Sequence, residues 1–480
     1  MSGPVHNAEE GRHRRLAYGR RDANESTRVD VVASVVEAVR VVLASRVNAA
    51  KRLAVAYSGG RDSTVLLDAA CRISRAASLE VAALHVHHGL SPEADRWIEH
   101  CTRECGHAGV PLYVERVSVT RASRTSLEDQ ARSARYDALV ALARRARTQV
   151  VLLAHHQDDQ AETLLLQLLR GSGPRGLAAM PVSRISSGVT WLRPLLDVPR
   201  AAIDAYAAQC RLQYVDDESN ASDAHRRNML RNTVIPALRE IRSGYPATLA
   251  RAAGLQAQAA ELIDALAEID AREHFDGASL ACVALASVST ARACNVLRWF
   301  LRSRGLPAPS SARLHAMLAQ FRDPRDDSQA TVRHAGREVS LFRGRIHAHA
   351  SALQPFSVSW AGGDRLALPH GELRVVRSSG GRIDPQRLFA TALHVRSRLG
   401  GERMALPASA GHRSLKDMLR EAGLPPWQRR ALPLVFAGER LAVVPGIAVD
   451  PAFLAPAGTD GVDLVWTPDV AACTRSVSSA

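Results

Sequence analysis

The feature that most constrains the fold is the segment at residues 53–63, which reads LAVAYSGGRDS. Its first five residues are a run of small and β-branched apolar residues, which is typical of a buried strand. The hexapeptide SGGRDS follows, and helical spacing of apolar residues resumes at Thr64. Glycines at a strand-to-helix turn let backbone N–H groups approach an anion, and the helix N-terminus adds partial positive charge. The segment therefore predicts a strand–loop–helix unit that binds phosphate.

The side chains of the hexapeptide fit the same role. Ser58 and Ser63 can donate hydrogen bonds to phosphate oxygens, and Asp62 can hold a Mg²⁺ ion that bridges the phosphates of a nucleotide. A plain glycine turn between strand and helix is the alternative, but the complete pattern in this context is far more specific than two glycines. The predicted nucleotide-binding residues are Ser58, Gly59, Gly60, Arg61, Asp62 and Ser63.

Strands and helices alternate after this point. We expect strands at 53–57, 80–86, 112–117 and 149–154, followed in turn by helices at 63–77, 93–108, 127–147 and 158–170. Such βα repetition predicts a parallel, doubly wound sheet that binds ligands at the carboxyl ends of its strands. A helix at 31–47 precedes the first strand, and helices near 199–210 and 228–242 end the domain.

The remaining sequence predicts further domains. We expect a disordered extension at 1–30, the α/β domain at 31–245, and a small, mostly helical domain at 246–355 that ends in a hairpin at 331–350. A linker with a β hairpin at 356–384 and a C-terminal α+β domain at 385–470 complete the predicted order.

The charge of the chain indicates a polyanionic partner. It carries a formal net charge of +14, and among its 62 basic residues only Lys51 and Lys416 are lysines. Arginine guanidinium groups pair bidentately with phosphate, so nucleic acid fits this surplus best. No apolar stretch approaches the roughly 20 residues of a membrane span, and the N-terminus has no apolar signal segment. We expect a cytoplasmic protein that does not contact membranes.

The seven cysteines favour neither disulfides nor a metal. Their number is odd, their spacing is irregular, and no CxxC occurs. One cluster, around Cys101 and Cys105, includes nearby histidines. We interpret these two thiols as buried small hydrophobic groups on one face of a helix.

A second candidate site follows the fourth strand, where residues 154–163 read AHHQDDQAET. If the helix begins near Asp158, then His155, Asp159 and Glu162 lie on one face beside the phosphate loop. Carboxylates beside a nucleotide can bind magnesium, orient an amine or take its proton. We predict such roles for Asp159 and Glu162, with Asp62 and Asp159 as metal ligands, and interpret Asp158 as a helix cap.

The motifs resemble known families. SGGRDS is similar to the loop of the N-type ATP pyrophosphatases, which split ATP between the α and β phosphates, and no GxxxxGK[ST] occurs. The motif at 154–163 together with LLRGSGPRGLAAM, RPLLDVPR, RRNMLRNTVIPAL and the run at 400–449 resembles, in order, the bacterial tRNA(Ile)-lysidine synthetase family. Arg61 occupies a loop position that is more often aliphatic in that family.

This resemblance implies a two-step reaction that uses ATP, Mg²⁺ and L-lysine. The carbonyl oxygen of the wobble cytidine of an isoleucine tRNA with a CAU anticodon attacks the α-phosphate, and the ε-amine of lysine then displaces AMP. By residue-wise transfer, Asp62 and Asp159 position the metal or lysine, Glu162 steers the amine, and His155 assists. Arg227 and Arg231 are implied to contact RNA or the nucleotide, with Arg193 as a weaker candidate. A homodimer is left open.

Other functions fit the residues of these motifs less well. A sulfur-transferring tRNA enzyme needs paired cysteines or an iron–sulfur cluster, and a glutamine-dependent ligase needs an amidotransferase cysteine in its own context. A non-catalytic RNA-binding protein would have no reason to keep Asp62, Asp159 and Glu162 beside phosphate. The cations of 385–470 are predicted to serve tRNA recognition, with a solvated charged face as the alternative.

Overall fold

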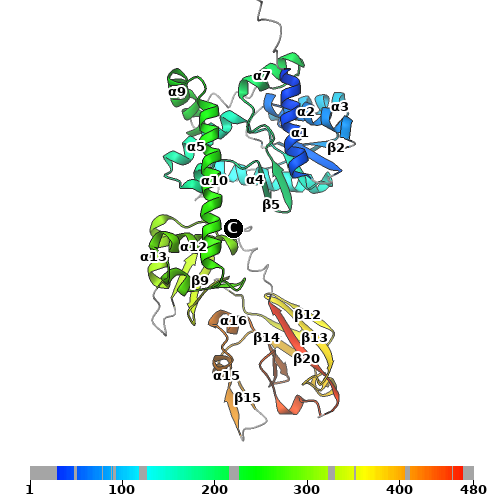
Figure 1. Ribbon diagram of the computed structural model, residues 1–480. Coiled ribbons are helices and arrows are strands. Elements are labelled where there is room, and N and C mark those ends of the chain that lie inside the picture. The colour runs from blue at the N-terminus through cyan, green and yellow to red at the C-terminus, as the bar shows by residue number, and fades with distance from the viewer. Residues whose placement is uncertain are drawn as a thin grey trace, which may run out of the picture. The chain divides into compact units, whose positions relative to one another are not determined.

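The computed structural model describes residues 30–47, 51–77, 79–87, 89, 93–117, 127–215, 226–322, 330–350, 353–405, 411–456 and 458–468 (Figure 1). The extension predicted at 1–30 lies outside the described residues except for Asp30. The chain forms two compact units, Met1–Glu261 and Leu262–Ala480. Within the described residues, none of the helices combines the length and the apolar character that a membrane span requires.

The first unit is built on a six-stranded sheet with the order β3-β2-β1-β4-β6-β5. Its strands are β1 Arg52–Ala56, β2 Glu80–His87, β3 Leu112–Arg116, β4 Val150–Leu152, β5 Ser183–Ser186 and β6 Val189–Leu192. Neighbouring strands are parallel except for the antiparallel β5–β6 pair. The first four strands confirm the predicted βα order, whereas the short β5–β6 hairpin was not predicted.

Helices cover both faces of this sheet, as a doubly wound fold requires. They are α1 Val31–Arg46, α2 Arg61–Ala77, α3 Ala94–Ala108, α4 Leu127–Arg145, α5 Gln157–Leu169, α6 Pro174–Leu177 and α7 Arg200–Gln209. Leu53 and Val55 of β1 are buried in one core with residues of α1, α2, α3 and α7. Ala54 lies in a second core with residues of α4. The alternation along β1 thus separates the two cores, because successive strand residues point to opposite faces.

Four further helices follow: α8 Arg226–Met229, the π-helix η2 Leu230–Val234, α9 Ile235–Ile241 and α10 Tyr245–Ala271. The helix predicted at 228–242 is therefore present but contains a π-helical turn. Leu230, Ile235 and Tyr245 pack with Ala161 of α5 in a small core, which holds this segment beside the carboxyl end of β4. Helix α10 begins at Tyr245, at the predicted domain boundary.

The second unit begins with a mixed helix-and-sheet region. It contains α11 Val283–Ala286, α12 Thr290–Ser303 and α13 Ser311–Phe321, with strands β7 Ser279–Ala281, β8 Thr331–His334, β9 Arg337–Phe342 and β10 Arg345–Ala350. The strands form an antiparallel sheet in the order β7-β10-β9-β8. Phe300, Leu314 and Ile346 join helices and sheet in one core. The region predicted as mostly helical thus also has a sheet, in which the predicted hairpin at 331–350 supplies three strands.

The C-terminal part contains three small sheets. Their strands are β11 Ser357–Trp360, β12 Arg365–Leu368, β13 Gly371–Ser379, β14 Leu393–Arg396, β15 Arg403–Ala405, β16 His412–Ser414, β17 Leu434–Ala437, β18 Arg440–Val444, β19 Ala448–Val449 and β20 Asp460–Pro468. The helices are α14 Pro385–Leu388, α15 Leu415–Glu421, α16 Pro426–Ala431 and the 3₁₀ turn η3 Pro451–Phe453.

The segment interpreted as a linker, 356–384, belongs to these sheets. Strand β11 pairs with β14, and β13 pairs with β20 over nine positions from Gly371↔Pro468 to Ser379↔Asp460. Its hairpin β12–β13 is therefore one part of a three-stranded sheet. The interpretation as a linker was wrong because local alternation marks a strand but does not identify a partner about 90 residues later in the chain.

Candidate active site

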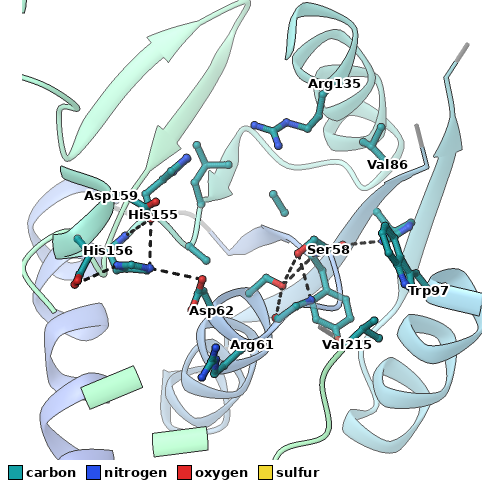
Figure 2. A pocket seen from close by; sticks show the side chains of 18 of the residues that line it. Ser58, Arg61, Asp62, Val86, Trp97, Arg135, His155, His156, Asp159 and Val215 are labelled. Carbon is teal, nitrogen blue, oxygen red and sulfur yellow. Dashed lines mark hydrogen bonds and ion pairs between the residues drawn. The ribbon is translucent and has the colours of Figure 1, made fainter. Parts of the chain in front are cut away.

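The candidate site lies where β1 and β4 end side by side. These strands are parallel, with Ala54 opposite Val151 and Val55 opposite Leu152. The chain continues from β1 to β2 on one side, whereas β4 lies on the other side of β1, so their carboxyl ends form the topological switch point of the sheet. A pocket of about 1030 Å³ opens there and is lined by residues of both loops (Figure 2).

The SGGRDS loop is tightly wound by its own hydroxyl groups. The backbone N–H of Gly60 donates to Ser58 Oγ at 3.3 Å, and Ser63 Oγ donates to the carbonyl of Gly60 at 2.9 Å. Gly59 has φ of +85°, and a Cβ there would lie 3.0 Å from Cys101 Sγ. Only glycine suits this conformation and this spacing. The loop thus leads directly into the N-terminus of α2 at the pocket.

His156 connects the two loops. Its Nε2 lies 3.6 Å from Asp62 Oδ2 and 3.5 Å from Asp159 Oδ2, and its Nδ1 lies 3.8 Å from Asp158 Oδ2. The ring is only 2% exposed. Figure 2 shows the imidazole between Asp62 and the first turn of α5. The sequence pattern did not distinguish His156 from His155, although the histidine doublet at the end of a strand was an available signal.

The charges of His156, Asp62 and Asp159 shift one another's pKa values. Burial lowers the pKa of His156, but the hydrogen bond that its ring donates to Asp62 and the charges of Asp159, Asp62 and Asp158 outweigh burial and raise it. Burial raises the pKa of Asp62, but His156 and Arg200 outweigh that effect and lower it. The pKa of Asp159 is likewise lowered, because His156 and Arg227 outweigh burial. Both carboxyl groups are therefore ionised at neutral pH.

Glu162 lies deeper and is held by two arginines. Its Oε2 accepts from Arg227 Nε at 2.8 Å, and its Oε1 accepts from Arg231 Nε at 2.6 Å. Arg231 also places Nη2 at 3.4 Å from Asp159 Oδ1. Glu162 is 3% exposed. The structure thus brings the predicted residues Asp159, Glu162, Arg227 and Arg231 together, with both oxygens of Glu162 occupied.

His155 precedes the helix instead of continuing its face. Helix α5 begins at Gln157, so helical spacing does not apply to residue 155. Its Nδ1 is buried and has no hydrogen-bond partner among the described residues. Burial lowers the pKa of His155, and the charges of Arg193, Arg135 and Arg227 add to this effect. The imidazole is therefore neutral.

The side chains of two predicted arginines, Arg61 and Arg193, contact other parts of the protein. Arg61 Nη1 pairs with Asp204 Oδ1 of α7 at 2.8 Å, and its guanidinium carbon lies 5.3 Å from the ring centroid of Tyr214. Arg193 is 4% exposed and donates from Nη1 to the carbonyl of Pro181 at 2.8 Å. Arg61 lines the pocket, whereas Arg193 supports the wall behind His155.

Comparison with known proteins identifies the family. The PP-loop domain family matches residues 33–238, the TilS substrate binding domain matches 280–347, and the TilS substrate C-terminal domain matches 393–466. The tRNA(Ile)-lysidine synthase of Alkalilimnicola ehrlichii is 42% identical over 84% of this chain and 91% of that protein. The chain belongs to the tRNA(Ile)-lysidine synthase family. Relatives with that name from Nitrosomonas europaea and Burkholderia pseudomallei are 37% and 40% identical, over 89% and 87% of this chain and 94% of each protein.

The carboxylates of the site fit magnesium bound together with a nucleotide. Asp62 Oδ1 is buried and has no hydrogen-bond partner among the described residues, which leaves an acceptor free. Mg²⁺ prefers oxygen ligands and is commonly held by one or two carboxylates plus phosphate oxygens. The described residues contain no group of three or more histidine, cysteine or acidic side chains that could hold a metal alone. Asp62 and Asp159 would therefore need substrate oxygens to complete a site.

The cysteine cluster shows no features of a ligand set. Cys101 and Cys105 are buried on α3, and Cys71 of α2 is buried in the same core. Burial raises the pKa of Cys101 and of Cys105 to about 12. Thiols with such pKa values stay protonated, which agrees with their interpretation as small hydrophobic groups.

We predict a pH-dependent contribution of His156 to stability. Its folded pKa exceeds its unfolded value of about 6.5, so the stabilisation is complete below the unfolded pKa and is lost as pH rises through the folded pKa. The free energy of unfolding of the wild type should therefore exceed that of His156→Gln by more near pH 6 than near pH 9. Chemical unfolding at both values measures this difference, with the exposed His107→Gln on α3 as control. A difference independent of pH would contradict it.

Proposed function

We propose that the chain joins free L-lysine to the wobble cytidine of an isoleucine tRNA with a CAU anticodon, forming lysidine. The carbonyl oxygen of the base attacks the α-phosphate of ATP and pyrophosphate leaves. The ε-amine of lysine then attacks the activated carbon and AMP leaves. The observation that carries this proposal is the meeting of the SGGRDS loop with the carboxylates of α5 in one pocket, in a chain of this family.

The nucleotide is assigned to the loop side of the pocket. Residues 58–63 carry two hydroxyl groups and lead into the N-terminus of α2, and these groups would bind the phosphates. Asp62 and Asp159 would hold a Mg²⁺ ion there, which would neutralise charge on the phosphates and the leaving pyrophosphate. His156 lies between these two carboxylates and holds them in place. Arg200 lies 3.7 Å from Asp62 Oδ2.

Glu162 is assigned to position the arginines. We expected from the sequence that it steers the lysine amine, but its two oxygens accept hydrogen bonds from Arg227 and Arg231. The two guanidinium groups keep outer N–H groups available for phosphate or base contacts. Asp159 and the neutral His155 are the groups that we assign to the amine.

The C-terminal region is assigned to tRNA recognition. Burial and the nearby charges of Arg398, Arg343 and Arg420 lower the pKa of Arg429, so four guanidinium groups lie near one another there and would bind phosphates. Because β11–β13 complete the C-terminal sheets, the recognition unit begins near residue 356. We further propose a cytoplasmic enzyme that uses ATP and Mg²⁺, and a homodimer stays a prediction.

The function is tested by incubating the protein with labelled lysine, ATP and a transcript of isoleucine tRNA carrying CAU. Label should enter the RNA, with release of AMP and pyrophosphate in equal amounts. A matched transcript with uridine at the wobble position is the control, because it lacks only the target base. ADP and phosphate as products, or no label in the CAU transcript, would refute the proposal.

Asp62→Asn should lower turnover by roughly 10²-fold or more while tRNA affinity is kept, because the amide retains the shape but loses the charge. Rates at saturating Mg²⁺ and filter binding of tRNA measure the two quantities. Asp68→Asn is the matched control on the same helix, since Asp68 pairs with Arg72 and Tyr206 instead of lining the pocket. Equal turnover of Asp62→Asn and wild type would remove Asp62 from the mechanism.

Glu162→Gln should slow adenylation and lysine transfer together, because both arginines lose their anionic partner. We also expect a loss of about 1–3 kcal/mol in the free energy of unfolding. Pyrophosphate release and lysine incorporation, measured in single turnovers, separate the two steps. A selective loss of transfer with unchanged stability would instead support direct contact between Glu162 and the amine.

A further inference from the structure

Arg135 differs from Arg61, Arg200 and Arg231, three other arginines of the pocket. It extends from α4 toward the space that Asp62 and Asp159 face from the other side (Figure 2). Within the part of the chain that the structure describes, its guanidinium makes no hydrogen bond or ion pair. Its recorded contact is with the ring of Tyr136, 5.8 Å from the guanidinium carbon to the centroid. By contrast, Arg61, Arg200 and Arg231 line the same pocket and each pairs with a carboxylate.

The surroundings of Arg135 make this charge costly. Burial lowers its pKa, and the nearby charges of Arg132 and Arg227 lower it further. His155 lies close to this group and carries no negative charge in either protonation state. Arg135 is only partly buried, so water screens part of its charge, but no described carboxylate pairs with it. A bound anion would supply that partner.

The pocket is therefore divided by charge. Its loop side carries the ionised carboxylates of Asp62 and Asp159, and its α4 side carries the unpaired Arg135, with Leu139 and Tyr136 beside it. A ligand with a cationic and an anionic end matches these two sides. The phosphates of the nucleotide are already assigned to the N-terminus of α2, so they do not account for Arg135.

We propose that Arg135 binds a substrate oxyanion. This inference rests on the proposed function, and it adds an anion subsite to the same pocket. The two sources of such an oxyanion are the α-carboxylate of lysine, whose amine end faces the carboxylates, and a phosphodiester of the RNA beside the target base. Planar guanidinium binds either group through two parallel hydrogen bonds.

The test compares wild type, Arg135→Gln and Arg135→Lys with lysine and with lysinamide, which lacks only the carboxylate charge. If the carboxylate is the ligand, Arg135→Gln should raise the KM for lysine at least 10-fold and leave the KM for lysinamide unchanged. If a phosphodiester is the ligand, the tRNA affinity should fall and the slope of log K against log salt should decrease by about one. Arg135→Lys should recover part of either loss.

The exposed neighbour provides the matched control. Arg132 lies on the same helix and contacts the same ring, 5.4 Å from guanidinium carbon to centroid, but it does not line the pocket. Arg132→Gln should change the KM values less than 2-fold. Because Arg135 is unpaired in the free protein, Arg135→Gln should have an unchanged or higher Tm, which a structural role would not give.

The outcomes separate the two proposals. Wild type that incorporates no lysine would refute the proposed function itself. Wild type that is active, with Arg135→Gln unchanged toward lysine, lysinamide and tRNA, would refute the anion subsite alone. A lower Tm together with equal losses toward lysine and lysinamide, and no recovery in Arg135→Lys, would show that Arg135 is structural and would also refute it.

Discussion

The site depends on one electrostatic constraint, the placement of His156 between Asp62 and Asp159. The two carboxylates come from helices that follow β1 and β4, and parallel pairing of those strands forces their first turns together. Two ionised carboxylates in one partly buried pocket repel each other. The imidazole of His156, at 3.6 and 3.5 Å from them, has its pKa raised by both carboxylates and offsets that repulsion when it is protonated. The fold can therefore hold the acids close to where phosphates would bind.

The arginines around the pocket balance the charges of its carboxylates in the same way. Arg227 and Arg231 share the carboxylates of Glu162 and Asp159, so their charges are balanced within the site. Arg200 lies beside Asp62 in the same way. Guanidinium N–H groups that these pairs do not use can still bind a polyanion. These three arginines are about one-third exposed, at 28%, 33% and 37%, so water screens them until a substrate arrives.

How much of this could be read from the sequence depends on the range of the interactions. The strand–loop–helix at 53–77 and the βα order were predictable, because apolar periodicity and glycine chemistry act locally. The pairing of β13 with β20 was not predictable, since the periodicity of a strand does not identify the strand that pairs with it. The sequence also did not indicate that His156, and not His155, lies between the two carboxylates. Consecutive residues at a strand end point to opposite sides, and which side faces the pocket depends on where α5 begins. Glu162 lines the pocket, but its hydrogen bonds with Arg227 and Arg231 join residues 65 and 69 positions apart, which no local pattern indicates.

The π-helical turn at Leu230–Val234 shows how local irregularity serves this arrangement. Arg227 and Arg231 are four residues apart, so a regular helix would stack their side chains along one face and direct both along the same line. Here the chain changes from α8 to a π-helix between them. Both guanidinium groups reach Glu162: Arg227 donates to Oε2, and Arg231 donates to Oε1 and Oε2. π-Helical turns are rare and occur often at functional sites. The irregularity is thus located at the residues whose geometry the pocket needs, while Leu230 and Ile235 on the other side keep packing against α5.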